Sequence, residues 1–433
     1  MNKNWLFGTT ALALAASFGA IAPANAQAFK TTNTEVTIGG YTRGFAGAVS
    51  ADRTTANFQG ADVQLDARFD ITARFATANG MQALGVIQFQ DQGRGSFDTV
   101  NNRFLIDSVM RRAYAGIGGA FGQVRVGRDD NASQQTFVGS FDAFTAGSAR
   151  LGKIYDFIGG SPLTVSADDT GVGSTSIRLF DRQSEKLVYI SPRIEGFQLV
   201  GSWTPEIAAG RNSEQPSSNG QTYINGLSAG LNFTRPIGSV AVSAYGTYYR
   251  WNATNPGAHS TNTSAFKLPD PSAYGFGLNA VWQGIQVGGS YTSYKDVANI
   301  ARGSYTATDT IGAGTNGLGT ATTIIGDSVG YEGGIGYIFG PASVSLNYFK
   351  GEADTDRASR SNGVKSAAPL GKDERSALAL NGAYTLAPGV SVQLSLFTLK
   401  QKSGYYNGFQ TQNTGVKNSQ KASGAVSALV LAF

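Results

Sequence analysis

Alternation of apolar and polar residues is the feature that most constrains this chain. Between residues 62 and 75, seven apolar side chains alternate with seven polar or charged ones. Because successive residues of a strand point to opposite faces, this segment presents one apolar and one polar face. Such a strand fits a soluble sandwich, where the apolar face meets a core, and equally a membrane barrel, where it meets lipid. The segment by itself leaves both folds open.

The number and spacing of such segments favour the barrel. Short joints alternate strictly with long, polar ones, and barrels of the outer-membrane type have short periplasmic turns and long external loops. We therefore predict an all-β fold, a 16-stranded antiparallel transmembrane β-barrel. The expected strands lie near residues 34–47, 59–77, 80–91, 104–118, 121–128, 183–191, 196–204, 222–235, 237–251, 272–282, 284–297, 327–339, 342–352, 373–386, 389–402 and 421–433. The short joints lie at residues 78–79, 119–120, 192–195, 236, 283, 340–341 and 387–388.

Composition narrows the function. The chain has no cysteine, which excludes disulfides and thiolate sites. It has a single histidine, His259, so very few side chains are available for acid–base catalysis near neutral pH. A net charge of +5 is too small an excess to indicate a nucleic-acid partner. We therefore expect neither an enzyme nor a cofactor.

The first 26 residues have the pattern of a signal peptide. Lys3 precedes an apolar stretch from Trp5 to Ile21, and small residues at Ala24 and Ala26 predict cleavage after Ala26. The predicted organisation is a signal peptide at 1–26 and one barrel domain at 27–433. No later stretch has 18 consecutive apolar residues, so an exported chain would be secreted, periplasmic or an outer-membrane barrel.

Aromatic residues near the strand ends are expected to form the interfacial girdles of a membrane barrel. The residues that suggest this are Tyr245, Tyr248, Tyr249, Trp251, Tyr291 and Tyr294.

The hairpin within residues 104–128 carries the most specific motif. Arg111 to Ile117, with Phe121-Gly122 and Val126 to Arg128, resembles the R-x-A-(Y/F)-x-G-L…FG…x-G-R hairpin of the Gram-negative general porins. The stretch from Arg182 through Tyr189 to Ser191-Pro192 is similar to that family's R…Y-x-S-P segment, and the chain ends on an aromatic residue, Phe433, as porins do. The resemblance implies a passive, homotrimeric channel in the outer membrane of a Gram-negative bacterium. It also implies that Phe433 is recognised by the outer-membrane insertion machinery.

The resemblance further implies a constriction. A loop at about 129–182 would fold into the barrel, with Arg68, Arg111 and Arg182 as basic wall residues. Asp156 stands close to the family's acid-F-G-G pattern, interrupted by one residue, and Asp142 is an acidic candidate by composition only.

The residues themselves give a similar placement for two arginines. By parity Arg68 shares a face with Asp66 and Asp70, and Arg111 shares one with Asp107, so both belong to the polar side of the wall. Such arginines either pair with neighbouring carboxylates to hold the wall or create a transverse field that selects solutes by size and charge. Both roles are compatible.

Arg112 does not fit this scheme. Strict alternation places it on the same face as Met110 and Tyr114, the side expected to meet lipid. A subunit interface that shields part of the exterior would accommodate the charge, and this is a hypothesis from the sequence.

Three further features of the sequence suggest functions other than passive diffusion. Residues 226–230 match the G-x-S-x-G nucleophile elbow, but Ser228 lies inside a predicted strand, whereas an elbow needs a strand-to-helix turn and a histidine. The acidic pairs at 129–130 and 168–169 could attract Ca²⁺. The alternative functions are a substrate-specific channel for a sugar, phosphate or organic anion, a barrel enzyme, and an adhesin or phage receptor.

Overall fold

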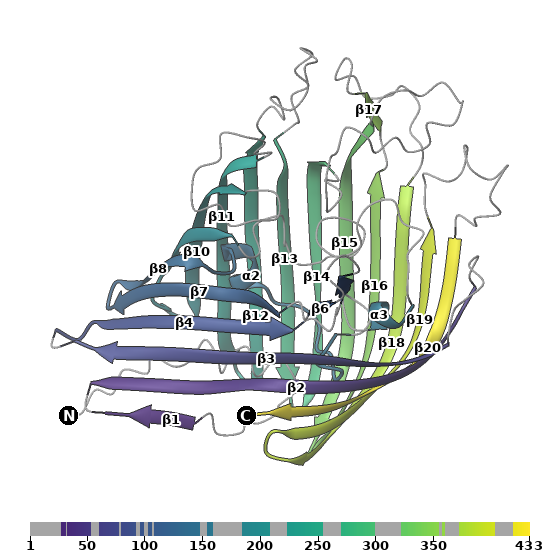
Figure 1. Cartoon of the computed structure of the whole chain (residues 1–433), viewed down its shortest axis with the longest axis horizontal. Coiled ribbons are helices and arrows are strands. Elements are labelled where there is room, and N and C mark those ends of the chain that lie inside the picture. The colour runs from purple at the N-terminus through teal and green to yellow at the C-terminus, as the bar shows by residue number, and fades with distance from the viewer. Residues whose placement is uncertain are drawn as a thin grey trace.

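The computed structural model of this chain is a closed β-barrel (Figure 1). It describes residues 27–31, 33–52, 60–77, 79–91, 96–98, 103–105, 108–147, 154–158, 184–207, 223–253, 270–298, 322–354, 357–359, 372–402 and 419–433. The barrel strands are β2 (Thr34–Ala51), β3 (Ala61–Ala76), β4 (Gln82–Asp91), β7 (Ser108–Gly119), β8 (Gly122–Arg128), β9 (Glu185–Ile190), β10 (Phe197–Ile207), β11 (Tyr223–Ile237), β12 (Val240–Ala253), β13 (Ser272–Trp282), β14 (Ile285–Ala298), β15 (Thr322–Phe339), β16 (Ala342–Asp354), β18 (Lys372–Ala387), β19 (Val390–Lys402) and β20 (Ser419–Ala432). Short additional strands are β1 (Gln27–Lys30), β5 (Ser96–Asp98), β6 (Arg103–Leu105) and β17 (Arg357–Ser359).

Closure of the sheet occurs between its first and last barrel strands. Arg43 of β2 is the register partner of Asp66 in β3 on one side and of Val430 in β20 on the other. Strand β1 pairs with β2 beyond the end of β20, so the described N-terminal residues and the C-terminus lie close together (Figure 1). A closed sheet leaves no free strand edge and satisfies the backbone polar groups within the wall. The predicted 16-stranded antiparallel barrel is confirmed.

Tight turns join the strands at one end of the barrel. Between β13 and β14, only Gln283 and Gly284 separate the paired residues Trp282 and Ile285. Both turn residues have positive φ, 47° and 85°, as a two-residue type I′ hairpin turn requires. We call this the turn end of the barrel, and the opposite end, with the long connections, the loop end.

Burial of the side chains decides between a sandwich and a membrane barrel. Along β19, the polar residues Ser391, Gln393 and Ser395 face inward and are buried. The intervening apolar residues, such as Leu394 and Leu396, point outward and are exposed. An apolar outer surface around a polar interior is the reverse of a soluble domain and matches a barrel surrounded by lipid.

The same alternation corrects the predicted aromatic girdles. Tyr245, Tyr249, Trp251 and Tyr294 face the lumen and are at most 5% exposed, so they are not girdle residues. Tyr248, between two of them, points outward and is 52% exposed. Clustering near strand ends was an incomplete criterion, because parity within the strand decides which aromatic side chains reach the membrane interface.

Two short helices lie within the curve of the sheet (Figure 1). Helix α2 (Ala132–Thr136) lies beside β10, β11 and β12, and α3 (Ile154–Ile158) lies beside β2. In the described part of the chain, neither these nor any other helix has the length and apolar character to cross a membrane.

Candidate functional site

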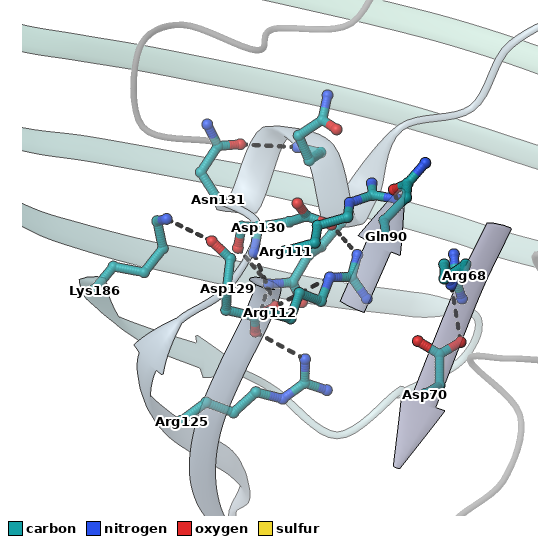
Figure 2. A network of polar contacts seen from close by, with 12 residues as sticks. Arg68, Asp70, Gln90, Arg111, Arg112, Arg125, Asp129, Asp130, Asn131 and Lys186 are labelled. Atoms are coloured by element: carbon teal, nitrogen blue, oxygen red, sulfur yellow. Dashed lines mark hydrogen bonds and ion pairs between the residues drawn. The ribbon is translucent and has the colours of Figure 1, made fainter. Parts of the chain in front are cut away.

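Directly after β8 the chain turns into the lumen at a cluster of ion pairs, shown in Figure 2. The carboxylate of Asp129 accepts from Arg125 at 3.1 Å, and its backbone oxygen accepts from the buried Lys186 ammonium at 2.5 Å. The Arg112 guanidinium pairs with Asp130 and lies 3.7 Å from Asp129. Both carboxylates are nearly inaccessible, at 1% and 4% exposure, so their charges are compensated by cations from β7 and β8. We call these residues the root of the loop.

Arg112 therefore faces the lumen, and the sequence hypothesis that placed it outside is wrong. Arg112 shares its face with Tyr114, as alternation requires, but the Tyr114 ring lies 5.0 Å from the lumenal Arg125 guanidinium carbon, so this face meets the lumen and not lipid. Only Met110 lies on the other side, because of a β-bulge between β4 and β7, where Gln88 pairs with Arg112 but the next residue, Phe89, pairs with Met110. Arg111 is the extra residue, and its Nη1 donates to the lumenal Gln90 at 3.0 Å. A bulge interrupts strict alternation, so both neighbouring arginines reach the interior.

The acidic pair at 129–130, considered above as a calcium site, belongs to the root of the loop. Asp129 and Asp130 are neutralised by arginines, and the Asn131 side chain caps α2 by accepting from the N–H of Gln134 at 2.9 Å. Among the described residues, no group of three or more His, Cys, Asp or Glu side chains has metal-site geometry. The other acidic pair, 168–169, lies outside the described residues.

Small hydroxyl residues fix α2 against the wall. The Ser133 hydroxyl lies 3.1 Å from that of Ser228 in β11 and 2.7 Å from that of Thr247 in β12. The N–H of Ala132 donates to the Ser202 hydroxyl in β10 at 3.2 Å. Ser228 thus sits inside a strand and holds the loop, which is not the geometry of a nucleophile elbow. His259 lies outside the described residues.

Beyond α2, the segment 137–147 follows the inner wall across several strands. Its backbone is not helical, so its buried N–H and C=O groups need partners from the wall. Polar side chains at regular inward positions supply them: Asn279 donates to the oxygen of Gly139 at 3.3 Å, and Asn347 to that of Phe141 at 2.7 Å. Ser345 accepts from the N–H of Ala143 at 3.0 Å.

A buried carboxylate holds the middle of this segment. Glu332 of β15, 8% exposed, accepts from the N–H and hydroxyl of Ser140 at 3.1 and 3.2 Å. It also accepts from the Ser290 hydroxyl of the neighbouring strand at 3.0 Å. One wall residue therefore joins the loop to two strands.

The segment ends against β19 and β2. Thr145 donates to Gln393 Oε1 through its N–H at 2.9 Å, and its backbone oxygen accepts from Arg43 at 3.4 Å. Phe144 packs against Phe45, with ring centroids 6.3 Å apart. The described part of the loop therefore covers the lumenal side of the wall from β8 through β19 to β2.

Helix α3 rests on a glycine of β2. A Cβ atom added at Gly47 would lie 2.5 Å from Cδ1 of the buried Phe157. No real Cβ contact is that short, so a side chain at position 47 must displace the ring.

We expect Gly47→Ala to destabilise the folded barrel by about 1 to 3 kcal/mol, the usual cost of overpacking. The measurement is urea-induced unfolding of protein refolded in lipid vesicles, followed by tryptophan fluorescence. Gly44→Ala is the matched control in the same strand, because nothing lies within 4 Å of that position. Equal stability of the two variants would contradict the contact.

The lumenal wall of β2, β3 and β7 carries charged side chains, whereas β4, which lies between β3 and β7, presents the neutral Gln88 and Gln90. Arg43 is ion-paired with Asp66 and donates to the Tyr41 hydroxyl at 2.9 Å. Arg68 pairs with Asp70 at 2.8 Å, and its guanidinium carbon lies 5.5 Å from the Tyr41 ring centroid. At 32% exposure the Arg68 side chain is accessible from the lumen.

The structure brings two of the five predicted site residues together. Arg68 and Arg111 lie on either side of Gln90 in β4 (Figure 2). Arg68 is the register partner of Gln90, and Arg111 donates to its side chain at 3.0 Å. Arg182 lies outside the described residues, and Asp156 lies in α3. Asp142 lies on the loop, half-buried, and accepts from the N–H of Phe144 at 3.0 Å.

Sequence reasoning did not single out Arg43, Arg125 or Lys186. The alternation of β2 could have placed Arg43 on the same face as Tyr41 and Phe45. Its pairing with Asp66 depends on the register between β2 and β3, which the sequence pattern does not specify.

This geometry defines a class of protein. An apolar exterior, a closed polar interior and a loop folded along the inner wall describe a membrane barrel that encloses a pore. A model of the family described as Gram-negative porin matches residues 8–404, and the chain therefore belongs to that family. It is an outer-membrane channel protein of a Gram-negative bacterium. No match was found among the curated proteins.

Solved structures of outer-membrane proteins share the fold. The trimer form of OmpT from Vibrio cholerae has a TM-score of 0.53 at 13% identity, covering 93% of this chain and 100% of its own. The anion-selective porin from Comamonas acidovorans has 0.52 at 14%, covering 92% and 100%. OmpF from Salmonella typhi, in complex with daunomycin, has 0.53 at 12%, covering 94% and 100%. At these identities the likeness concerns the fold alone.

Proposed function

We propose that this protein is a passive diffusion channel for small hydrophilic solutes and ions, with selection at a constriction inside the barrel. The observation that carries this proposal is the path of residues 129–147, which are hydrogen-bonded along the lumenal wall and leave Arg68 of β3 and Arg111 of β7 on the remaining side. Passage down a gradient requires neither catalysis nor a cofactor.

The proposed selectivity comes from charge at this narrowing. Arg68, Arg111 and Arg182 form the basic side, and Asp142 and Asp156 are the proposed acidic side. Within the described cluster, six cations stand against four carboxylates, an excess of two positive charges: Arg43, Arg68, Arg111, Arg112, Arg125 and Lys186 against Asp66, Asp70, Asp129 and Asp130. In a lumen with low-dielectric walls such an excess attracts anions and repels cations.

Neutralising Arg68, Arg111 and Arg182 together, each to Gln, is expected to raise the cation-to-anion permeability ratio by a factor of roughly 3 to 10. Reversal potentials of the refolded mature protein in planar bilayers under a salt gradient measure this ratio. The matched control removes three exposed charges from the outer surface or turn end, at Arg235, Arg250 and Lys295. An unchanged reversal potential in the lumenal variant would refute the proposed constriction.

A channel specific for phosphate or an organic anion is the second candidate. It is favoured by the number of arginines on adjacent strands, because β2, β3, β7 and β8 bring five of them to one side of the lumen. Arginine matches the geometry of phosphate and carboxylate. Conductance that saturates with one organic anion, but not with chloride, would favour this candidate over general diffusion.

The proposed partners follow from the family. We propose a homotrimer in the outer membrane, in contact with lipid, and recognition of Phe433 by the insertion machinery. The Phe433 side chain is 47% exposed while its backbone pairs with Gly40 at 2.8 and 3.1 Å, so the ring is accessible at the seam of the folded barrel.

A further inference from the structure

The tripeptide Gly-Leu-Asn occurs twice in the part of the wall that the loop covers. It stands at residues 230–232 in β11 and at residues 277–279 in β13. Leu231 and Leu278 are exposed on the outer surface, so in both strands the glycine and the asparagine face the lumen. The same two residue types therefore meet the loop at two separate places.

The asparagines hold the backbone of the loop. Asn232 donates to the oxygen of Thr136 at 3.2 Å, and Asn279 donates to that of Gly139 at 3.3 Å. An asparagine side chain is short, and a hydrogen bond to a carbonyl oxygen weakens quickly with distance. These two bonds therefore form only while the loop lies close to the wall.

The glycines leave the space that this close approach needs. A Cβ atom added at Gly230 would lie 2.4 Å from Oγ1 and 2.8 Å from Cγ2 of Thr136. One added at Gly277 would lie 2.2 Å from the backbone oxygen of Val138, besides 2.6 Å from Cε1 of Tyr245 in the wall. Real Cβ atoms do not come within 3.0 Å of such neighbours. Any side chain at either position must displace the loop.

Strand β15 combines the same two functions with other residues. Glu332 binds Ser140 through its carboxylate, and a Cβ atom added at Gly336 would lie 2.2 Å from Cδ1 of Phe141. Glycine inside a strand is typical of places where another backbone approaches closely. Between Thr136 and Phe141, three strands thus each provide one polar side chain that holds the loop and one glycine that admits it.

We propose that the two Gly-Leu-Asn tripeptides determine the width of the pore, and with it the size limit for solutes, by fixing how close the loop lies to the wall. This inference rests on the proposed diffusion function and adds to it the residues that limit solute size. Nonbonded atoms need about 3.5 Å, so a methyl group at either glycine moves the loop by about 1 Å toward the open side of the lumen. Pore diameter is one of the properties that select solutes.

The experiment measures the size limit of the full mature protein refolded in lipid. Vesicle swelling is recorded with two uncharged sugars, a pentose and a disaccharide, whose entry reports pore width separately from pore charge. Single-channel conductance is recorded in salt with the same preparations. For Gly277→Ala we expect conductance to fall by roughly a third, and entry of the disaccharide to slow about threefold more than entry of the pentose.

A second variant moves the same bulk from the loop to the wall. Gly230→Ala alone should narrow the pore as Gly277→Ala does. Thr136→Ala removes the two atoms nearest to the added methyl group, so Gly230→Ala combined with Thr136→Ala should restore the conductance and the disaccharide entry of the unaltered protein. This pair decides the question if Gly277→Ala does not fold.

Gly246→Ala in β12 is the matched control and should leave both measurements unchanged. In the described part of the chain, nothing lies within 4 Å of a Cβ atom at that position. The same size limit in the Gly230→Ala variant and the unaltered protein would overturn the proposal, as would a wider pore or a failure of Thr136→Ala to restore the conductance. These outcomes leave the diffusion function intact, whereas an unaltered protein that admits neither sugar would overturn the diffusion function and this inference together.

Discussion

Replacing Arg112 with Met is expected to destabilise the folded barrel by about 3 kcal/mol, because it leaves a buried carboxylate without its cation. Asp130 is 4% exposed and pairs with Arg112, whereas Asp129 keeps Arg125 at 3.1 Å. We place the effect at the lower end of the range for broken buried pairs, since the Arg112 side chain is 29% exposed. Urea-induced unfolding in lipid vesicles measures the loss.

A second substitution separates loss of the charge pair from loss of packing. Arg112→Met combined with Asp130→Asn removes the uncompensated charge and should recover a large part of the lost stability. Arg235→Met is the control, because its pair with Glu195 is exposed and worth at most about 1 kcal/mol. If the double variant is no more stable than Arg112→Met, the ion pair at the root of the loop does not carry the effect.

Replacing Glu332 with Leu is expected to release the middle of the loop and to cost about 3 kcal/mol. Three donors, from the N–H and hydroxyl of Ser140 and the hydroxyl of Ser290, would lose a charged acceptor in a buried position. Since the freed segment faces the lumen, single-channel recordings should show increased open-channel noise. Stability and current noise are therefore measured on the same protein.

Two milder variants test whether the effect comes from the loop. Ser290→Ala removes one wall bond and leaves both bonds to Ser140, so about 1 kcal/mol and normal current noise are expected. Glu332→Gln keeps the shape and one acceptor oxygen and should lie between the two. Increased noise in Ser290→Ala, or normal noise in Glu332→Leu, would show that this carboxylate does not hold the loop.

The inner wall carries different side chains where the loop covers it and where it is open to the lumen. Where the loop covers the wall, neutral side chains such as Asn347 and Gln393 satisfy its backbone, and the buried charge of Glu332 is held by several donors. Where the loop leaves the wall open, Arg68 carries the charge and is paired with Asp70 along β3. Arg43, paired with Asp66 across β2 and β3, lies where the loop ends and donates to the Thr145 oxygen. Buried backbone needs matched hydrogen bonds, whereas charges are tolerated beside water.

Part of the site was predictable from residue parity. Arg68 was placed on the polar face because Asp66 and Asp70 alternate with apolar neighbours, and the structure confirms the lumenal face and adds the contact with Asp70. Parity applied to Tyr245 and Tyr249 would also have corrected the girdle prediction, since both share the inward face of β12. These conclusions need only the local period of two.

The sequence by itself determined the fold class, the even number of strands, the short-turn and loop ends, and the face of most side chains. Alternation and turn residues are local properties, and a closed barrel is the arrangement that satisfies all of them in lipid. Only the tertiary structure decided that Arg43 meets Asp66, that a bulge lets Arg111 face inward beside Arg112, and that the loop follows the wall to β19 and β2. Register, bulges and loop contacts depend on residues distant in sequence, and one inserted residue reverses the parity that the sequence pattern relies on.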